Sequence, residues 1–209
     1  MVKPAIEEAV EMLYLSVTEQ VKSRADDGTQ AALDEARGLG LVEEGGAGTT
    51  LTAAGMQLGR DVVRRHRLAE RLLADVLGAN AAYLHEDACL FEHILQHGLT
   101  ERICELLGHP AACPHGKPIP SGPCCERARA DAIQEVGPLC DGRPGHEGVV
   151  AYLSTRDSRE VQKMMAMGIL PGTRIRVIQS FPSHVFQIGY SQFAVDRELA
   201  EAIHVHWAT

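Results

Sequence analysis

The spacing of apolar residues in this chain changes near Gly137-Pro138, and this change restricts the possible folds more than any other feature. Before it, apolar side chains recur every three or four residues, which is typical of amphipathic helices. After it, short apolar runs alternate with turn residues, which is typical of the strands of a small barrel. The sequence therefore predicts a mainly α N-terminal region and a small, all-β C-terminal barrel, with Asp141–Gly145 as a linker.

The composition narrows the class of protein. With 45% hydrophobic residues, the chain has enough apolar material for one large domain or for two to three small ones. No apolar run approaches the roughly 20 residues that a bilayer span needs, and acidic residues follow Met1–Pro4 where a signal peptide is apolar. We therefore expect a cytoplasmic protein with no membrane partner. Its cysteines should then stay reduced, as ligands, core residues or redox-active thiols.

The first 60 residues predict two helices and a hairpin. Apolar residues at steps of three or four predict a helix over residues 4–22, and Asp26–Gly28 predicts a turn. Thr29 is expected to cap a second, short helix. Residues 39–44 and 49–52 predict two short strands around a glycine-rich turn. Such a hairpin is typical of the wing in a winged-helix domain.

A helical segment is expected next. Thr52 is predicted to cap a long helix that runs to about Leu77 and stops at Gly78. Residues 108–123 contain five prolines and are expected to form an irregular, rigid loop. Further helices are predicted at 85–96, 100–107 and 124–134. Beyond the linker, strands are predicted at 148–153, 174–179, 185–189 and 193–195, with one helix at 159–167.

One predicted helix carries a group of metal-binding residue types. At about 100° per residue, His85, Cys89, Glu92 and His93 fall within roughly a third of the helix circumference. Imidazole, thiolate and carboxylate together suit Fe²⁺, Mn²⁺, Zn²⁺, Co²⁺ or Ni²⁺ rather than calcium or magnesium. The alternative is a polar helix face with one buried cysteine. We favour a transition-metal site because four ligand types share one arc.

Two further helices offer matching pairs. His66 and Glu70 lie one turn apart on the long helix, and Glu8 and Glu11 lie one turn apart on the first. Either pair alone is typical of a solvated face. A metal held by separate helices, however, links the position of the N-terminal segment to metal occupancy, which a metal-driven switch requires.

These motifs resemble those of a known family. The run Arg64–Leu73 (RRHRLAERLL), followed by His85–His93 (HEDACLFEH), closely resembles the metal-binding and dimerisation domain of the diphtheria toxin repressor family of iron- and manganese-dependent transcriptional regulators. The resemblance covers about residues 50–121 and includes Gly116–Pro120 (GKPIP). It implies a homodimeric repressor, not an enzyme, that binds operator DNA through a winged helix-turn-helix when Fe²⁺ or Mn²⁺ is bound.

The resemblance also implies roles for the ligand candidates. It assigns His66, Glu70 and His85 to an ancillary site. The residues that it assigns to a primary, activating site are Glu8, Glu11, Cys89, Glu92 and His93. Glu8 and Glu11 resemble the manganese-responsive branch and Cys89 the iron-responsive one, so the metal stays open.

The C-terminal part has its own resemblance. Arg159–Thr173 and Ile188–Val195 are similar to the FeoA-type, SH3-like barrel of ferrous iron transport. In the family this barrel can supply ligands to the ancillary site, for which Glu160 and Gln162 are candidates. The expected domains are a truncated winged helix at 1–60, a helical metal-binding and dimerisation domain at 61–140, and the barrel at 141–209.

The proline-rich loop adds soft ligands. Cys113 and His115 lie within it, Cys124 and Cys125 follow it, and further cysteines are nearby at 104 and 140. The spacing is not that of a regular zinc finger. We expect an additional structural Zn²⁺ or an iron–sulfur cluster that uses Cys113, His115, Cys124 and Cys125. Reduced thiols or a redox pair are the alternative.

Charge qualifies the DNA-binding expectation. Residues 1–60 hold ten acidic and five basic side chains, a net charge of −5. The candidate recognition helix, Thr29–Arg37, has one basic residue. The stretch between Tyr14 and Gly40 is about ten residues shorter than the family pattern requires, so one helix of the motif is expected to be missing. Arginines of the long helix are expected either to form a basic stripe or to pair with neighbouring acids. The second hypothesis is a metal-sensing or metal-handling interaction protein that has lost operator binding.

Overall fold

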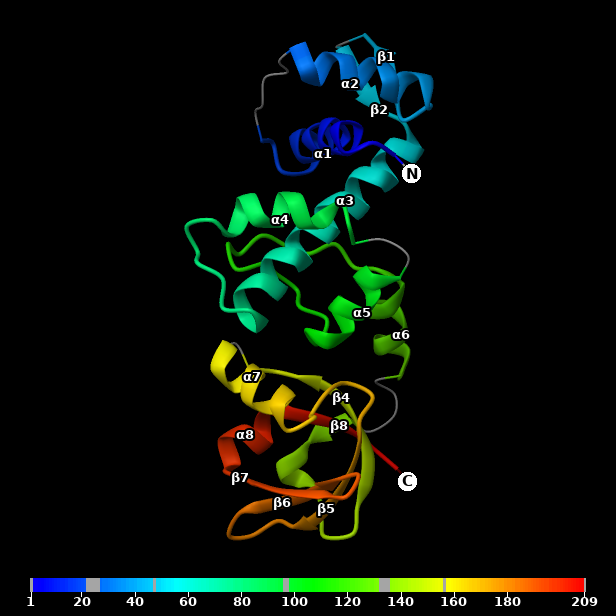
Figure 1. Cartoon of the computed structure of the whole chain (residues 1–209). Helices are drawn as coiled ribbons and strands as arrows, with labels where there is room; N and C mark the ends of the chain where they lie inside the picture. Colours follow the sequence, from blue (N-terminus) through cyan, green and yellow to red (C-terminus); the bar gives the residue numbers. More distant parts are fainter. Residues whose placement is uncertain are drawn as a thin grey trace.

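The chain forms three layers stacked along one axis (Figure 1). The computed structural model describes residues 2–21, 27–46, 48–95, 98–131, 136–155 and 157–208. The N-terminal layer lies at the top of Figure 1, a helical layer in the middle and a β-sheet layer at the bottom. Within the described ranges, no helix combines the length and the apolar character that crossing a membrane requires.

The top layer consists of two helices and a hairpin. Its elements are α1 (Pro4–Thr18), α2 (Asp27–Gly38), β1 (Val42–Gly45) and β2 (Gly48–Leu51). The strands pair antiparallel, so the predicted wing hairpin is confirmed. The predicted turn and cap before α2 are wrong, because Asp27 and Gly28 already lie in this helix and Thr29 therefore does not cap it; Asp26 lies outside the described residues.

The middle layer is built around one long helix. Its elements are α3 (Ala53–Arg71), which continues as a π-helical turn (Leu72–Val76), α4 (Leu84–Glu92), α5 (Leu99–Leu106) and α6 (Pro123–Asp131). Thr52 caps α3 as predicted, because its hydroxyl accepts a hydrogen bond from the Gly55 amide at 3.1 Å. Helix α4 ends at Glu92, earlier than the predicted Gln96, which lies outside the described residues. The loop before α6 contains an isolated bridge between Ala112 and Pro118.

The bottom layer is an antiparallel sheet with two helices. Its elements are β3 (Val136–Pro138), β4 (Glu147–Leu153), α7 (Ser158–Ala166), β5 (Arg174–Gln179), β6 (His184–Ile188), β7 (Ser191–Val195), α8 (Arg197–Ala202) and β8 (Ile203–Trp207). In the described residues the strand order is β3-β8-β4-β5-β6-β7. β3, α8 and β8 were not predicted from the sequence, although β8 joins β3 to β4.

The predicted linker Asp141–Gly145 is wrong. The short helix just before it contributes Leu139, 1% exposed, to the core of the barrel. The amide of Gly145 donates to the carbonyl of Val177 on β5 at 2.8 Å. This segment therefore packs on the sheet, and β3 precedes it within the same sheet.

The barrel lies against the lower end of the helical layer. Gln162 on α7 donates its side-chain amide to the carbonyl of Val76 at 2.9 Å. Glu160 instead accepts a hydrogen bond from Thr155 within the barrel. Both candidate barrel ligands thus have other partners in this structure.

Candidate metal centre

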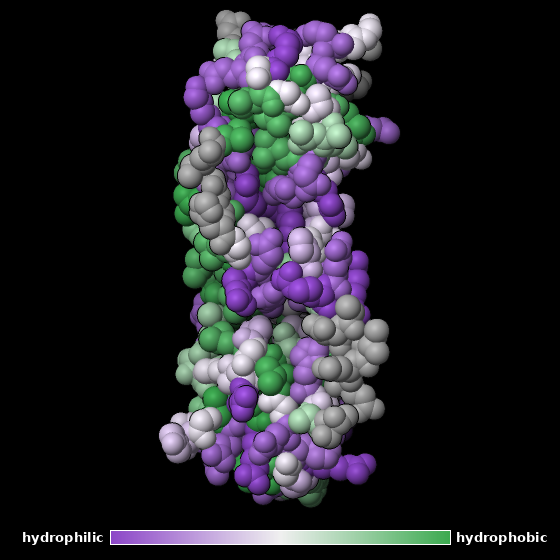
Figure 2. Space-filling view, turned by 90° about the vertical axis from the view of Figure 1, so that its right-hand side faces the viewer, coloured by the Kyte–Doolittle hydropathy of each residue, from purple (hydrophilic) through white to green (hydrophobic). Residues whose placement is uncertain are grey.

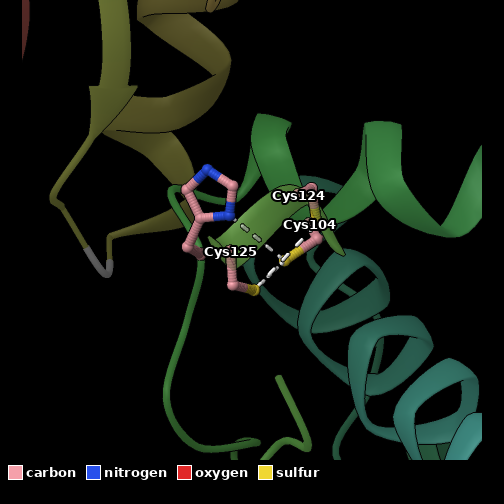
Figure 3. Close-up of side chains that lie close together, drawn as sticks. Cys104, Cys124 and Cys125 are labelled. Carbon is pink, nitrogen blue, oxygen red and sulfur yellow. Dashed lines mark hydrogen bonds between the residues drawn. The ribbon is translucent and has the colours of Figure 1, made fainter. Parts of the chain in front are cut away.

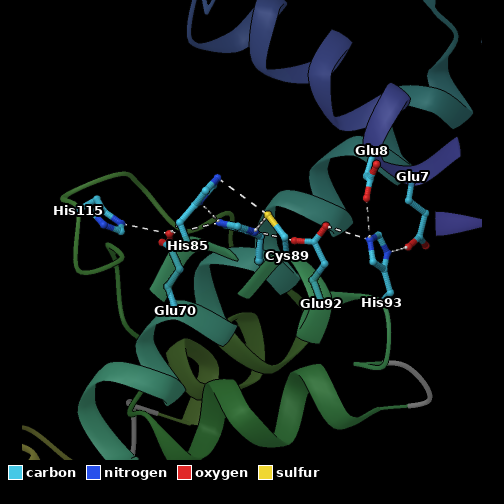
Figure 4. A network of polar contacts seen from close by, with 9 residues as sticks. Glu7, Glu8, Glu70, His85, Cys89, Glu92, His93 and His115 are labelled. Atoms are coloured by element: carbon cyan, nitrogen blue, oxygen red, sulfur yellow. Dashed lines mark hydrogen bonds and ion pairs between the residues drawn. The ribbon is translucent and has the colours of Figure 1, made fainter. Parts of the chain in front are cut away.

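Side chains from three helices and one loop meet where α1 crosses α3 and α4 (Figure 4). We call this group the helical network. Its members are Glu7, Glu8, Glu11, His66, Glu70, His85, Cys89, Glu92, His93, Cys113 and His115.

His66 of α3 lies at the centre of the helical network. Its Nδ1 is 2.7 Å from Oε2 of Glu92, and its Nε2 is 3.2 Å from Oε1 of Glu70 and 3.1 Å from Nδ1 of His85. Cys89 Sγ lies 3.9 Å from a nitrogen of each imidazole. His66, Glu70 and Glu92 are all buried, so the protein holds ionisable groups where burial is unfavourable unless they are paired.

The end of the network next to α1 centres on His93. Nδ1 of His93 is 2.7 Å from Glu7, and its Nε2 is 3.6 Å from Glu8 and 3.6 Å from Glu92. Glu7 is buried and also pairs with Arg65 at 2.7 Å. Carboxylates from α1 and from α4 therefore face the same imidazole.

The opposite end of the network centres on Glu70. Its Oε1 is 3.1 Å from Nδ1 of His115 and 3.6 Å from Nδ1 of His85. Cys113 joins Glu70 and His115 in one group, whose ligand atoms lie within 4.8 Å of one another. A cavity of about 370 Å³ opens here, lined by both histidines and Cys113. An ion can therefore reach this end from solvent.

The ionisation of the network reflects concentrated negative charge. Burial, reinforced by the charge of Glu92, raises the pKa of Glu11 to about 7. Burial alone lowers the pKa of His66, but hydrogen bonds to Cys89, Glu70 and Glu92 outweigh it and raise the pKa to about 12. Burial also raises the pKa of Glu70, but its hydrogen bonds with His66 and Cys113 lower that pKa to about 2.

The donor set fits a divalent transition metal. Without a cation, a proton on His66 offsets part of the carboxylate charge, and Glu11 resists ionisation beside Glu92. A dication neutralises these carboxylates more completely than a proton does. Imidazole and carboxylate ligands with one or two thiols suit iron, manganese or zinc. The network holds all of these donors.

The structure groups the predicted ligands differently from the two sites that the resemblance implied. His66, assigned there to the ancillary site, touches Glu92 of the primary site. Cys89, assigned to the primary site, lies with His66 and His85. Glu7 was missed, although its spacing of four residues from Glu11 places both on one face of α1.

The cysteines of the predicted extra site lie in two separate groups of side chains. Cys113 and His115 lie with Glu70 in the helical network rather than with Cys124 and Cys125. The proline-rich loop runs along α3 and so separates the two pairs. Cys124 and Cys125 instead approach Cys104 of α5 and His109 just after it (Figure 3). The sequence analysis missed His109, which follows Cys104 by five residues.

The arginines of α3 point to partners within the chain. Arg65 pairs with Glu7, and Arg71 pairs with Asp75. Arg60 donates to the carbonyl of Ser121, Arg64 to that of Pro120, and Arg67 to that of Pro118. The hypothesis of a basic stripe along α3 is therefore wrong, and pairing within the chain is the arrangement observed.

Comparisons with known proteins show what the chain is similar to. A family model described as iron dependent repressor, metal binding and dimerisation domain, matches residues 52–121, and the FeoA domain matches residues 137–206. The iron-dependent repressor IdeR of Mycobacterium leprae is 28% identical over 95% of this chain and 90% of the relative. That of Mycobacterium tuberculosis is 31% identical over 74% of this chain and 71% of the relative. The structure of the manganese regulator SloR shares the fold, with a TM-score of 0.50 over 97% of this chain and 98% of that chain, at 19% identity.

Proposed function

This chain belongs to the family of iron-dependent repressors, and we propose that it is a transcriptional regulator activated by Fe²⁺ or Mn²⁺. The observation that carries the proposal is the helical network, in which α1 and α4 present carboxylate and imidazole groups to each other. We also propose three domains, and we place the second boundary before β3 rather than at residue 141, because β3 pairs with β8.

The network has room for two ion positions. We assign Glu8, Glu11, Glu92 and His93 to a position beside α1, which is the activating one. We assign Glu70, Cys113 and His115, with His85 at 3.6 Å from Glu70, to a second position at the open cavity. His66 and Cys89 lie between the two and can serve either. Bound metal supplies positive charge that holds these donors together.

The switch follows from where α1 is anchored. Ile6, Ala9 and Val10 of α1 pack in the core of the top layer with α2, while Glu8 and Glu11 of the same helix face the middle layer. An ion shared by α1 and α4 therefore restrains the top layer against the helical layer. In a two-fold dimer this fixes the separation of two DNA-binding surfaces and lowers the cost of ordering them on DNA.

Exposed apolar side chains support a homodimer. Leu90 and Ile94, at the end of α4 and just after it, are 76% and 64% exposed, and Tyr83 before α4 is also exposed. Seen from the right-hand side of Figure 1, the molecule also has hydrophobic surface gathered on its upper half (Figure 2). Contiguous apolar surface is characteristic of interaction sites. The matched family domain, which includes α4, is described as a dimerisation domain.

The top layer favours a second candidate function, that of a metal-responsive protein without operator binding. Helix α2 directly precedes the wing, as a recognition helix does. Arg37, in the last turn of α2, forms ion pairs with Asp34 and Glu44. Glu35 of the same helix forms an ion pair with Lys3. Such a surface offers little positive charge to phosphates.

A DNA-binding assay separates the two functions. If the chain is a repressor, Mn²⁺ or anaerobic Fe²⁺ should raise its affinity for selected genomic fragments by about 5- to 150-fold over EDTA, the usual range of coupling between two sites. Fluorescence anisotropy at moderate salt measures the affinity, and light scattering on the same samples gives the number of chains bound. Metal binding without any sequence-selective, metal-dependent DNA binding would instead establish the second function.

A further inference from the structure

We propose that Cys104, His109, Cys124 and Cys125 bind one zinc-class ion in a tetrahedral site separate from the helical network. We call these four residues the cysteine cluster. It is built from α5, the residue that begins the proline-rich loop, and the first turn of α6 (Figure 3). Three thiols and one imidazole form a donor set common in structural zinc sites.

The spacing of the ligand atoms matches a single tetrahedral ion. Sulfurs at about 2.3 Å from zinc lie about 3.8 Å apart, and a sulfur and an imidazole nitrogen about 3.6 Å apart, at the corners of a tetrahedron. Cys104 Sγ lies 3.6 Å from Cys125 Sγ, and Cys124 Sγ lies 4.0 Å from Cys125 Sγ. Nδ1 of His109 lies 3.5 Å from Cys104 Sγ. All four ligand atoms lie within 4.8 Å of one another.

The backbone around the cluster aims His109 inward. His109 has a positive φ of 55°, which L-residues rarely adopt, and its amide donates to the carbonyl of Cys104 at 2.8 Å. This bond folds the chain back on the end of α5 and brings the imidazole of His109 next to the thiol of Cys104. Sparsely populated backbone conformations of this kind gather at functional sites.

A buried arginine supplies the charge that such a site requires. Three thiolates and a neutral imidazole around a dication leave a net charge of −1. The guanidinium of Arg64 donates to Cys124 Sγ at 3.1 Å and to Cys125 Sγ at 3.7 Å. A Cβ on Gly122 would lie 2.7 Å from Nε of Arg64, so only glycine leaves room for the arginine here. The positive end of α6 also favours thiolates at Cys124 and Cys125.

The protonation of Cys125 agrees with this charge. Burial raises the pKa of its thiol, but hydrogen bonds to the Gly122 backbone and to Cys104, together with Arg64, outweigh burial and lower the pKa. Cys104 and Cys124, by contrast, have raised pKa values because of burial. A metal is the ordinary partner that deprotonates a buried thiol.

The same distances disfavour an iron–sulfur cluster. Each thiolate of a [4Fe–4S] cluster binds a different iron, so the sulfurs stand farther apart than around one ion. The cysteine cluster offers four protein ligands, which leave no coordination position for substrate, and its Cys104 and Cys124 are 0% and 1% exposed. A closed, four-ligand site is the structural type rather than the catalytic type.

The location indicates what the ion stabilises. His109 and Cys125 line a cavity of about 420 Å³ between the helical layer and the barrel, together with Tyr152 and His206 of the sheet. An ion held by α5, α6 and the loop joins three segments of the helical layer that face the barrel. The proposed ion therefore sets the position of the barrel without taking part in metal sensing.

Metal analysis of the full chain tests the proposal. The two proposed positions of the helical network are first disabled by Glu92→Ala and Glu70→Ala together, so that zinc retained after dialysis against EDTA belongs to the cysteine cluster. We expect about one zinc per chain. When Co²⁺ replaces the zinc, the absorption spectrum should show the visible bands of tetrahedral Co²⁺ and strong charge-transfer bands from sulfur to the metal. Adding Cys125→Ser should remove this zinc, whereas adding Cys140→Ser, at a thiol outside the cluster, should not.

His109 provides the variant that avoids a buried substitution. His109→Cys should keep the ion with a spectrum of four thiolates, and His109→Ala should release zinc to a chelator at least about tenfold faster. Less than half an equivalent of zinc in the chain with both Glu92→Ala and Glu70→Ala overturns the proposal. So does a mass lower by two hydrogens that traces to a Cys104–Cys125 disulfide. Neither result concerns metal binding by the helical network. That binding is measured separately, on the unmodified chain.

Discussion

Replacing Glu92 with alanine is expected to weaken Mn²⁺ binding to the helical network by at least about 100-fold, because loss of even an outer-shell partner of a metal site reduces affinity 10- to 100-fold. Glu92 is 1% exposed and is the one described carboxylate that touches both His66 and His93. Its removal takes away a proposed ligand and the carboxylate that both imidazoles contact. Glu92→Gln keeps the volume and loses the charge, so it should show the same loss with less disturbance of packing.

Isothermal titration calorimetry measures this affinity, and circular dichroism checks that each variant is folded. The matched control is Glu86→Ala, which removes an exposed carboxylate from the first turn of the same helix. Glu86→Ala should bind Mn²⁺ as the unmodified chain does. If folded Glu92 variants bind Mn²⁺ with unchanged affinity, Glu92 is not a ligand, and the proposed ion position beside α1 is wrong.

Metal affinity is expected to rise steeply with pH. In the metal-free protein His66 carries a proton at neutral pH because its pKa is raised to about 12, and a metal that binds its nitrogen must displace that proton. Glu11, whose pKa is raised to about 7, must lose a second proton below that pH. The association constant should therefore gain about one power of ten per pH unit from His66, and about one more below pH 7 from Glu11.

The same shifts fix the sign of the pH effect on stability. Both groups have folded-state pKa values above their unfolded values of 6.5 and 4.5, so each stabilises the metal-free fold at low pH. That stabilisation is lost as pH rises through about 7 for Glu11 and about 12 for His66. The metal-free chain should thus be less stable at about pH 8 than at about pH 6, and the stabilisation by Mn²⁺ should be larger at about pH 8.

Calorimetry in buffers of different ionisation enthalpy counts the protons released on binding. The unmodified chain should release roughly one more proton than Glu11→Gln at about pH 6, and the two should differ little at about pH 8. Gln57→Glu, at an exposed position on α3 that faces Asp61 rather than the network, serves as the charge control. An equal proton count for the unmodified chain and Glu11→Gln at both pH values would contradict the role of Glu11.

Local patterns in the sequence predicted most of the helices. The recurrence of apolar residues every three or four positions located α1, and Thr52, which caps α3 through its hydroxyl, located the start of that helix. The strands β4 to β7 were also located, because turn residues separate them. β3 was missed because three residues carry too short a pattern. β8 was missed even though Ile203, Val205 and Trp207 alternate with histidines, which is the two-residue period of a strand.

The candidate site was predicted as a set of residues but not as an arrangement. The spacing within α4 placed His85, Cys89, Glu92 and His93 on one side of the chain. Which of them meets which partner depends on how α1 and α3 cross α4, and no local pattern records this. Cys113 and His115 illustrate the point, because their neighbour Glu70 lies more than forty residues away in the sequence. Long-range packing also brings His109 to Cys124 and Cys125.

Anomalous scattering from a crystal soaked with Mn²⁺ tests the convergence of α1, α3 and α4 most directly. Data collected near the manganese absorption edge should show a peak in contact with Glu92 and His93 on one side and with a carboxylate of α1, Glu8 or Glu11, on the other. A peak ligated only by side chains of α3, α4 and the loop would leave α1 without a link to metal. No peak among these residues, at Mn²⁺ concentrations that saturate binding in solution, would contradict the account altogether.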